Sequence, residues 1–175
     1  MKLYGSILGI GALRLEEMIK RVDSAGIDGF HFDISDGCFA PSLTFGPSLV
    51  KDLKGITPKS FDVHLMVSNP ERYFGQLPSV DTVYFHTEAS HDVKKDISAL
   101  KKLGVSAGIA LSLGTGFEKI SEIELADSVL VLLVMPGFSG QKMIAGEIQK
   151  NFGAEVQHSR RRGHHALQCE ELAGS

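Results

Sequence analysis

Short strand-like segments alternate with helix-like segments along the first 150 residues, and this alternation constrains the fold more than any other feature. The strand-like segments are 2–8, 29–34, 60–67, 81–88, 105–112 and 128–134. The segments between them that favour helices are 14–26, 47–55, 69–77, 92–104 and 116–125. In the helix at 69–77 we expect Asn69 to be the N-cap and Pro70 the first helical residue. This order predicts a parallel sheet covered by helices.

Doubly wound sheets and (β/α)8 barrels both fit this order, and the positions of polar residues distinguish them. Polar side chains fall at or near the C-terminal ends of different strands, where barrel enzymes place their catalytic groups: His31, Asp33, His64, His86 and Glu88. No Gly-x-Gly-x-x-Gly motif follows the first strand, which disfavours a dinucleotide-binding sheet. We therefore expect an α/β chain of the (β/α)8 TIM-barrel type.

The number of strand–helix units is smaller than that of a whole barrel. A complete barrel usually needs about 250 residues, and the alternation here stops near Lys150. We therefore expect a barrel truncated after about six β/α units, with residues 1–150 as one partial domain. Residues 151–175 contain three of the seven histidines and a run of three arginines, without a strand-like segment. We interpret them as a divergent tail outside the barrel and assign them no function.

The composition disfavours several classes of function. The net charge of -3 argues against binding to nucleic acid or to a membrane surface through bulk charge. The two cysteines, Cys38 and Cys169, lie far apart and outside any Cys-x-x-Cys motif, so neither a disulfide framework nor a cysteine zinc site is expected. Because no leader-like segment and no bilayer-spanning apolar run is present, we expect a cytoplasmic protein.

The stretch HFDISDG, residues 31–37, places a histidine and an aspartate on one face of a strand. Side chains alternate along a strand, so His31, Asp33 and Ser35 point to one side while Phe32 and Ile34 point to the other. A hydrogen-bonded polar pair at a strand end is the simpler interpretation of an isolated His-x-Asp. Metal ligation or proton transfer is the alternative, and these residues alone leave both open.

Three motifs taken together resemble those of the ribulose-phosphate 3-epimerase family: HFDISDG at 31–37, FDVHLMV at 61–67 and PGFSGQ at 136–141. The segments SIL at 6–8, LTFGPSLVK at 43–51 and NPERY at 69–73 extend the resemblance, which ends near residue 150. The resemblance implies a (β/α)8 fold. It also implies an isomerase of carbohydrate metabolism, in the pentose phosphate pathway, that converts D-ribulose 5-phosphate to D-xylulose 5-phosphate through an enediolate.

The resemblance also implies roles for individual residues. His31, Asp33 and His64 would bind one divalent metal ion, which could be zinc, iron, manganese or cobalt. Asp33 would also be one of two carboxylates that move the proton at C3 of a ketose phosphate. Substrate contacts would come from Ser6, His64, Met66, Gly137, Phe138, Ser139 and Gly140. His86 and Glu88 would form hydrogen bonds around the site.

The chain departs from the family pattern at several of these places. Ser35 and Leu132 stand where the family has methionines, Ser42 where it has asparagine, and Ser139 where it has glycine. The sequence contains no Val-Asp-Gly-Gly motif, whose aspartate in the family is the fourth metal ligand and the second acid/base group. The alternatives are therefore an inactive metal-binding or sugar-phosphate-binding protein, and an epimerase for a six-carbon ketose phosphate. For a six-stranded sheet with open edges we expect a homo-oligomer or self-association.

Overall fold

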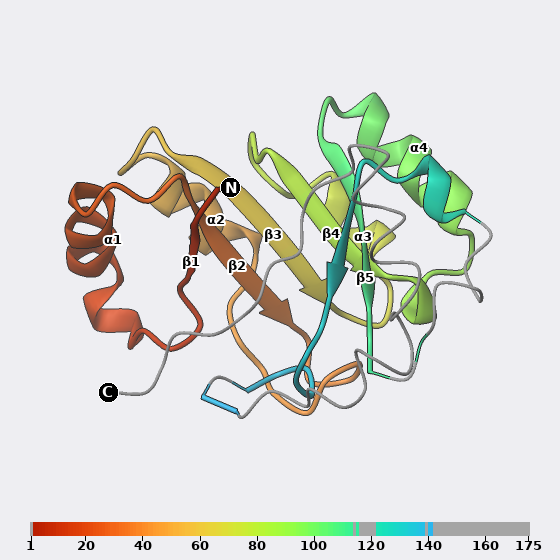
Figure 1. The fold of residues 1–175 in the computed structure, drawn as a ribbon, viewed down its shortest axis with the longest axis horizontal. Helices are drawn as coiled ribbons and strands as arrows, with labels where there is room; N and C mark the ends of the chain where they lie inside the picture. Colours follow the sequence, from red (N-terminus) through yellow and green to blue (C-terminus); the bar gives the residue numbers. More distant parts are fainter. Residues whose placement is uncertain (1, 114, 116–121, 139, 142–175) are drawn as a thin grey trace.

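A computed structural model of the chain describes residues 2–113, 115, 122–138 and 140–141. Within these residues, six strands form one parallel sheet in chain order, and Figure 1 shows the sheet curling as half a barrel. The strands are β1 (Tyr4–Ser6), β2 (Gly29–Ser35), β3 (Ser60–Met66), β4 (Thr82–His86), β5 (Ser106–Leu111) and β6 (Ser128–Val131). Each strand pairs in parallel with the next one along the chain. The barrel-type α/β fold expected from the sequence is confirmed, with six strands in the described part of the chain.

Helices follow the first four strands and cover one face of the sheet. They are α1 (Leu15–Ser24), α2 (Pro47–Lys54), α3 (Glu71–Phe74) and α4 (Val93–Lys102). Short 3-10 turns lie at η1 (Ala12–Arg14), η2 (Thr87–Ala89) and η4 (Ile123–Leu125). Among the described residues, no helix has both the length and the apolar character needed to cross a lipid bilayer.

The core lies between the sheet and the helices, because alternate residues of the strands are apolar and point toward the helices. Its fully buried members include Phe32, Val63 and Phe85 from strands and Ile19, Val50 and Leu100 from helices. The opposite face carries the polar residues of the same strands. It also carries a smaller apolar cluster, made of Tyr84, Ala110, Leu130 and Leu132. The two-residue period of the strands therefore separates a packing face from a face that is free for chemistry.

Several expected elements differ from the structure or lie outside it. Strand β1 covers Tyr4–Ser6 rather than 2–8, and α3 is a single turn whose N-cap is Pro70 rather than Asn69. Asn69 contributes its backbone carbonyl, which accepts a hydrogen bond from the Arg72 N–H at 3.2 Å, and its side chain does not cap the helix. Apart from η4, most of the helix expected at 116–125 lies outside the described residues, as does the tail 151–175.

Candidate functional site

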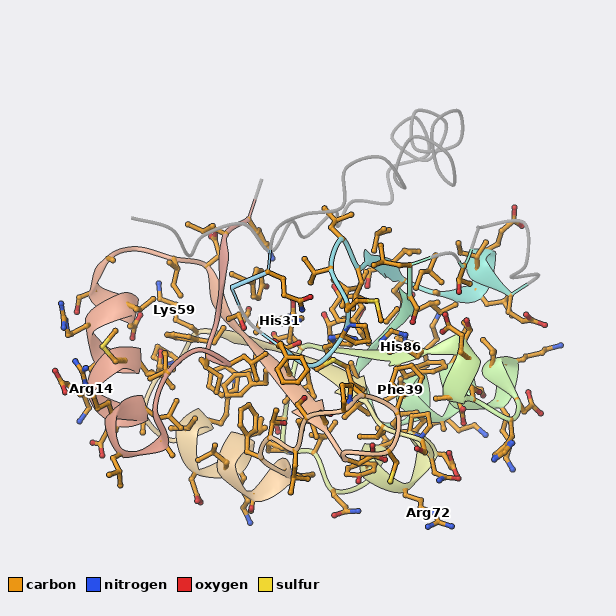
Figure 2. The ribbon with its side chains drawn as sticks, turned by 90° about the horizontal axis from the view of Figure 1, so that it is seen from below. Arg14, His31, Phe39, Lys59, Arg72 and His86 are labelled. Carbon is orange, nitrogen blue, oxygen red and sulfur yellow. The ribbon has the colours of Figure 1, made fainter. Side chains whose placement is uncertain are left out.

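Three polar side chains meet on the face of the sheet that points away from the helices, on β2 and β3. The register pairs Asp33 with His64 across the two strands, so their side chains project side by side. His31 precedes Asp33 by two residues and shares its face. The exposed fractions of His31, Asp33 and His64 are 5%, 3% and 2%. The residues expected to bind metal therefore gather in one buried cluster, and Figure 2 shows His31 in the interior of the molecule.

Asp33 is the centre of this cluster. Its Oδ1 lies 2.9 Å from Nδ1 of His64 and 3.4 Å from Nε2 of His31. Its Oδ2 accepts a hydrogen bond from Ser6 Oγ at 3.0 Å. The end of β1 therefore reaches the cluster and orients the carboxylate from its other side.

Burial and hydrogen bonding act in opposite directions on the charges of the cluster. Burial disfavours the charged carboxylate of Asp33, but the charge and the hydrogen bonds of His31 and His64 outweigh it and lower its pKa. Burial is the larger effect at His64 and lowers the pKa of that imidazole to about 4, although the hydrogen bond to Asp33 raises it. At neutral pH an ionised carboxylate therefore lies beside a neutral imidazole, and these are the protonation states that bind metal cations.

The donor atoms of this cluster fit a divalent transition metal. One nitrogen from each of His31 and His64 and one oxygen from Asp33 all lie within 4.8 Å of one another. Two imidazole nitrogens and one carboxylate oxygen are ligands that zinc, iron, manganese and cobalt accept. Within the part of the chain that the structure describes, this is the one such group of His, Cys, Asp and Glu.

Met66 extends the same face of β3 beyond the cluster. It is buried, and the register pairs it with Ser35 at the end of β2. The Ser35 hydroxyl donates a hydrogen bond to the carbonyl oxygen of Ser42 at 2.6 Å, and the Thr44 hydroxyl donates to the carbonyl oxygen of Asp33 at 2.9 Å. The loop after β2 is thereby fastened to the strand end that carries the cluster.

The glycine-rich turn expected to contact a substrate phosphate follows β6. Gly137 has a φ of 106° and Gly140 a φ of 75°, values that other residues rarely adopt. A Cβ atom at Gly137 would lie 2.7 Å from Ser42 Oγ, so the turn packs closely against the loop after β2. Phe138 is 55% exposed, and Ser139 lies outside the described residues. A phosphate-binding role for this turn stays a prediction.

His86 lies beside the cluster, in agreement with the hydrogen-bonding role expected for it around the site. It ends β4, is fully buried, and its Nε2 lies 2.9 Å from Nε2 of His64. The ring of Phe39 covers His86 with 4.5 Å between the ring centroids, and Figure 2 shows the two side chains together. The position of His86 at the end of a strand was the sequence feature that indicated a place near the site. Phe39 lies in a loop, where no periodic pattern could indicate it.

Asp36 holds the loop that carries Phe39, and sequence reasoning missed it. Its carboxylate accepts hydrogen bonds from the backbone N–H groups of Cys38 at 2.8 Å, Phe39 at 3.0 Å and Ser68 at 2.9 Å. Burial opposes the charged form, but these bonds outweigh it and lower the pKa of Asp36. An Asp-Gly pair directly after a strand is a turn signal that could have identified this role.

Comparison with known proteins relates the chain to one family. The model of the ribulose-phosphate 3 epimerase family matches residues 2–170. The match therefore extends beyond residue 150, near which the resemblance of the motifs ends. The curated ribulose-phosphate 3-epimerases of Chlamydia pneumoniae and Methanocaldococcus jannaschii are 37% and 38% identical over 83% and 82% of this chain. The chloroplastic ribulose-5-phosphate-3-epimerase of Arabidopsis thaliana is 35% identical over 83% of the chain.

These matches cover 65%, 62% and 53% of the three relatives, so the chain spans between about half and two thirds of their length. The family match nevertheless includes every element of the curled sheet and all residues of the buried cluster. The chain therefore belongs to the ribulose-phosphate 3 epimerase family.

Proposed function

We propose that this chain provides a metal site and an acid/base carboxylate for the epimerisation of a ketose phosphate at C3, with D-ribulose 5-phosphate as the substrate. The observation that carries the proposal is the buried cluster in which Asp33 contacts both His31 and His64. The names of the relatives support the choice of substrate. This function would place the chain in the pentose phosphate pathway.

His31, Asp33 and His64 would hold the metal ion, which we propose to be zinc, iron, manganese or cobalt. A bound cation of this kind stabilises the negative charge that develops on the substrate oxygens as a proton leaves the neighbouring carbon. The burial of all three side chains supports this role, because charge interactions are stronger where water is excluded.

Asp33 is the residue that we propose to move the C3 proton. Its lowered pKa keeps the carboxylate ionised at neutral pH, so it is able to accept a proton. The hydrogen bond from Ser6 to Oδ2 holds the carboxylate in a defined orientation. Loss of the proton produces a planar enediolate, and inversion then requires a second group that returns a proton to the opposite face. Asp33 by itself accounts for exchange at one face.

Deuterium exchange separates proton removal from inversion, so it tests the proposal directly. The chain is supplied with each metal in turn and incubated with D-ribulose 5-phosphate in heavy water. NMR follows the C3 proton of the substrate, while a coupled assay measures D-xylulose 5-phosphate. We expect the C3 signal to disappear, and Asp33→Asn should slow this loss by about 10²–10⁴-fold. Asp52→Asn changes an exposed carboxylate on α2 and is the matched control, with an unchanged rate.

The outcomes distinguish the alternatives. Exchange with inversion indicates a complete epimerase, whereas exchange with retained configuration indicates that Asp33 acts on one face only. Metal binding without exchange would contradict the proposal and favour an inactive metal-binding protein. Exchange that Asp33→Asn leaves unchanged would show that another group removes the proton.

One observation favours a second candidate substrate, a six-carbon ketose phosphate. Ser35 and Ser42, which replace a methionine and an asparagine of the family pattern, contact each other, with their hydroxyl oxygens 3.5 Å apart. Both serines are smaller than the residues they replace, and Ser35 lies beside Met66. A wider and more polar site suits a longer sugar chain. Faster exchange with a six-carbon 2-ketose 6-phosphate would support this candidate, and Ser35→Met should then reverse the preference.

A further inference from the structure

A tyrosine of β4 lies in the same row of the sheet as two of the candidate metal ligands. The register pairs Asp33 with His64, and His64 with Tyr84 on the next strand. The row continues through Gly108 on β5 to Ser128 on β6. Side chains that pair in this way across parallel strands point to the same face of the sheet. Tyr84 therefore faces the site, where it is 2% exposed.

The ring of Tyr84 lies over β5, where a glycine leaves room for it. A Cβ atom at Gly108 would lie 3.0 Å from Cγ of the ring and closer still to Cδ1 and Cε1. The ring also belongs to a buried apolar cluster whose other members are Ala110, Leu130 and Leu132. A closely packed interior leaves a ring little freedom to move. Residues of β5 and β6 therefore hold the Tyr84 ring in one place.

The same ring packs against the imidazole of His31. The centroids of the two rings are 6.2 Å apart, with 46° between the ring planes. This separation is within the range in which aromatic rings contact each other. In the sheet, β3 lies between β2 and β4 (Figure 1), so the two side chains meet across a strand. The curl of the sheet is what brings them together.

The orientation of the His31 imidazole depends on such neighbours. The last torsion of a histidine side chain has broad energy minima, so the side chain alone does not fix the plane of its ring. Nε2 of His31 lies 3.4 Å from Oδ1 of Asp33, and the centroid of the His64 ring is 6.0 Å from that of His31. Both neighbours are candidate metal ligands, so neither is an independent support. Of the two rings recorded against His31 among the described residues, the ring of Tyr84 is the one that belongs to no candidate ligand.

We propose that Tyr84 is a positioning residue for the candidate metal site: its ring supports the His31 imidazole with Nε2 directed at the Asp33 carboxylate, and β5 and β6 hold that ring. The inference rests on the metal site of the proposed function. It extends the site from the polar residues of β2 and β3 to the apolar cluster around Tyr84.

Cobalt binding by purified variants tests the proposal, because the visible absorption of bound cobalt depends on the geometry of its ligands. Tyr84→Leu keeps an apolar side chain but removes the ring. An imidazole that is free to turn must be immobilised when it binds the ion, so Tyr84→Leu should weaken cobalt binding by about 2–10-fold. The absorption bands should shift as well. Tyr84→Phe keeps the ring and should show the affinity and the bands of the wild type.

Phe74→Leu is the matched control. Phe74 is a buried ring, 5% exposed, that packs against Phe85 on the face of the sheet covered by helices. Its replacement removes a ring from the core away from the site. A purely structural role for Tyr84 predicts that both leucine variants lose stability while the folded proteins keep the cobalt affinity and bands of the wild type. Wild-type affinity and bands in Tyr84→Leu, or an equal loss of affinity in Phe74→Leu, would overturn the proposal.

A measurement on the wild-type chain covers the case in which Tyr84→Leu does not fold. Nuclear Overhauser effects between the ring protons of Tyr84 and His31 should be present in the metal-free chain and in the chain loaded with zinc, which is diamagnetic. Their persistence would show that the ring still contacts the imidazole when the ion is bound. Their loss on zinc binding would overturn the proposal.

The failures of the two proposals are distinguishable. Wild-type protein that binds no zinc, iron, manganese or cobalt would overturn both the metal site and the role of Tyr84. Wild-type protein that binds cobalt, with equal affinity and equal bands in Tyr84→Leu, would overturn the role of Tyr84 alone and leave the metal site intact.

Discussion

Each buried polar side chain of the site is held by a neighbour of complementary hydrogen-bonding character. Asp33 accepts from Ser6 and contacts His64, and His64 in turn contacts His86. A buried polar group that loses its partner costs about 1–3 kcal/mol. These residues therefore stabilise the folded state as a set, and a change to one of them affects the groups that it leaves behind.

Glu88→Gln should lower the free energy of unfolding at neutral pH by less than about 1 kcal/mol, because Glu88 is an exposed residue and solvent screens its charge. The pKa of Glu88 is about 2 in the folded chain, against an ordinary value of 4.5, because hydrogen bonds from His86 and Thr115 outweigh burial. A lowered pKa means that the unfolded chain binds the proton more readily. The contribution of Glu88 is therefore complete above the ordinary pKa and is lost as the pH falls toward about 2.

Urea unfolding of the wild type and of Glu88→Gln at a series of pH values measures this difference. The difference in stability between the two proteins should shrink steadily as the pH falls below that of an ordinary glutamate. Glu17→Gln removes an exposed carboxylate whose nearest cation, Arg14, lies 3.8 Å away, and it should change stability little at any pH. A difference for Glu88→Gln that is the same at every pH would show that its charge plays no part.

The sequence was sufficient to predict the cluster around Asp33 and a hydrogen-bonding role for His86 near it, but not that His64 is the residue that His86 contacts. The two-residue period of a strand places His31 and Asp33 on one face, and the family motifs add His64. The approach of His86 depends on the stagger between β3 and β4, in which the lateral neighbour of His64 is Tyr84 rather than His86. No local pattern encodes that stagger, because it is set by the curvature of the whole sheet.

At the scale of the elements, strand β5 approaches β4 closely through a glycine. A Cβ atom at Gly108 would lie 2.5 Å from Cε1 of Tyr84 and closer still to Cδ1. Tyr84 is 2% exposed and packs against Ala110, so its ring has little room to move. Gly108→Ala should therefore lower the free energy of unfolding by about 1–3 kcal/mol, as measured by urea unfolding.

Gly75→Ala is the matched control for Gly108→Ala. Gly75 follows α3 with a φ of -74°, and no atom lies near a Cβ built there. An alanine at that position meets no obstacle and restricts the unfolded chain, so stability should stay the same or rise. Equal stability of Gly108→Ala and the wild type would mean that Tyr84 moves aside without loss of packing.

The strands were easier to predict from the sequence than the segments that join them. The apolar residues of β2, β3 and β5 repeat every second position, and each strand lies within the expected segment or extends it by one residue. Helix α3 is shorter than expected, because its start is set by backbone hydrogen bonds around Pro70 that composition does not reveal. The loop after β2 owes its shape to Asp36, whose partner Ser68 is 32 residues away in the sequence.

At the scale of the whole molecule, the curled sheet gathers the strand ends that form the site. Ser6 on β1, Asp33 on β2, His64 on β3 and His86 on β4 form one hydrogen-bonded series across four neighbouring strands. Each of these contacts crosses a strand boundary. The site is therefore a property of the sheet, and it should be lost when the sheet opens even if the helices persist.

The edges of this sheet lead to a last prediction about assembly. Within the described residues, β1 pairs only with β2 and β6 only with β5, so each has one row of backbone N–H and C=O groups without a strand partner. β6 is strongly apolar, and such edges pair readily with another chain.

Hydrogen exchange should therefore be slowest in β2–β5 and faster in β1 and β6 in dilute solution, with added protection of both edges at high concentration. Light scattering on the same samples should show the matching increase in mass. Edge protection that is strong at every concentration, in a monomer, would contradict self-association and would mean that another part of the same chain covers these strands.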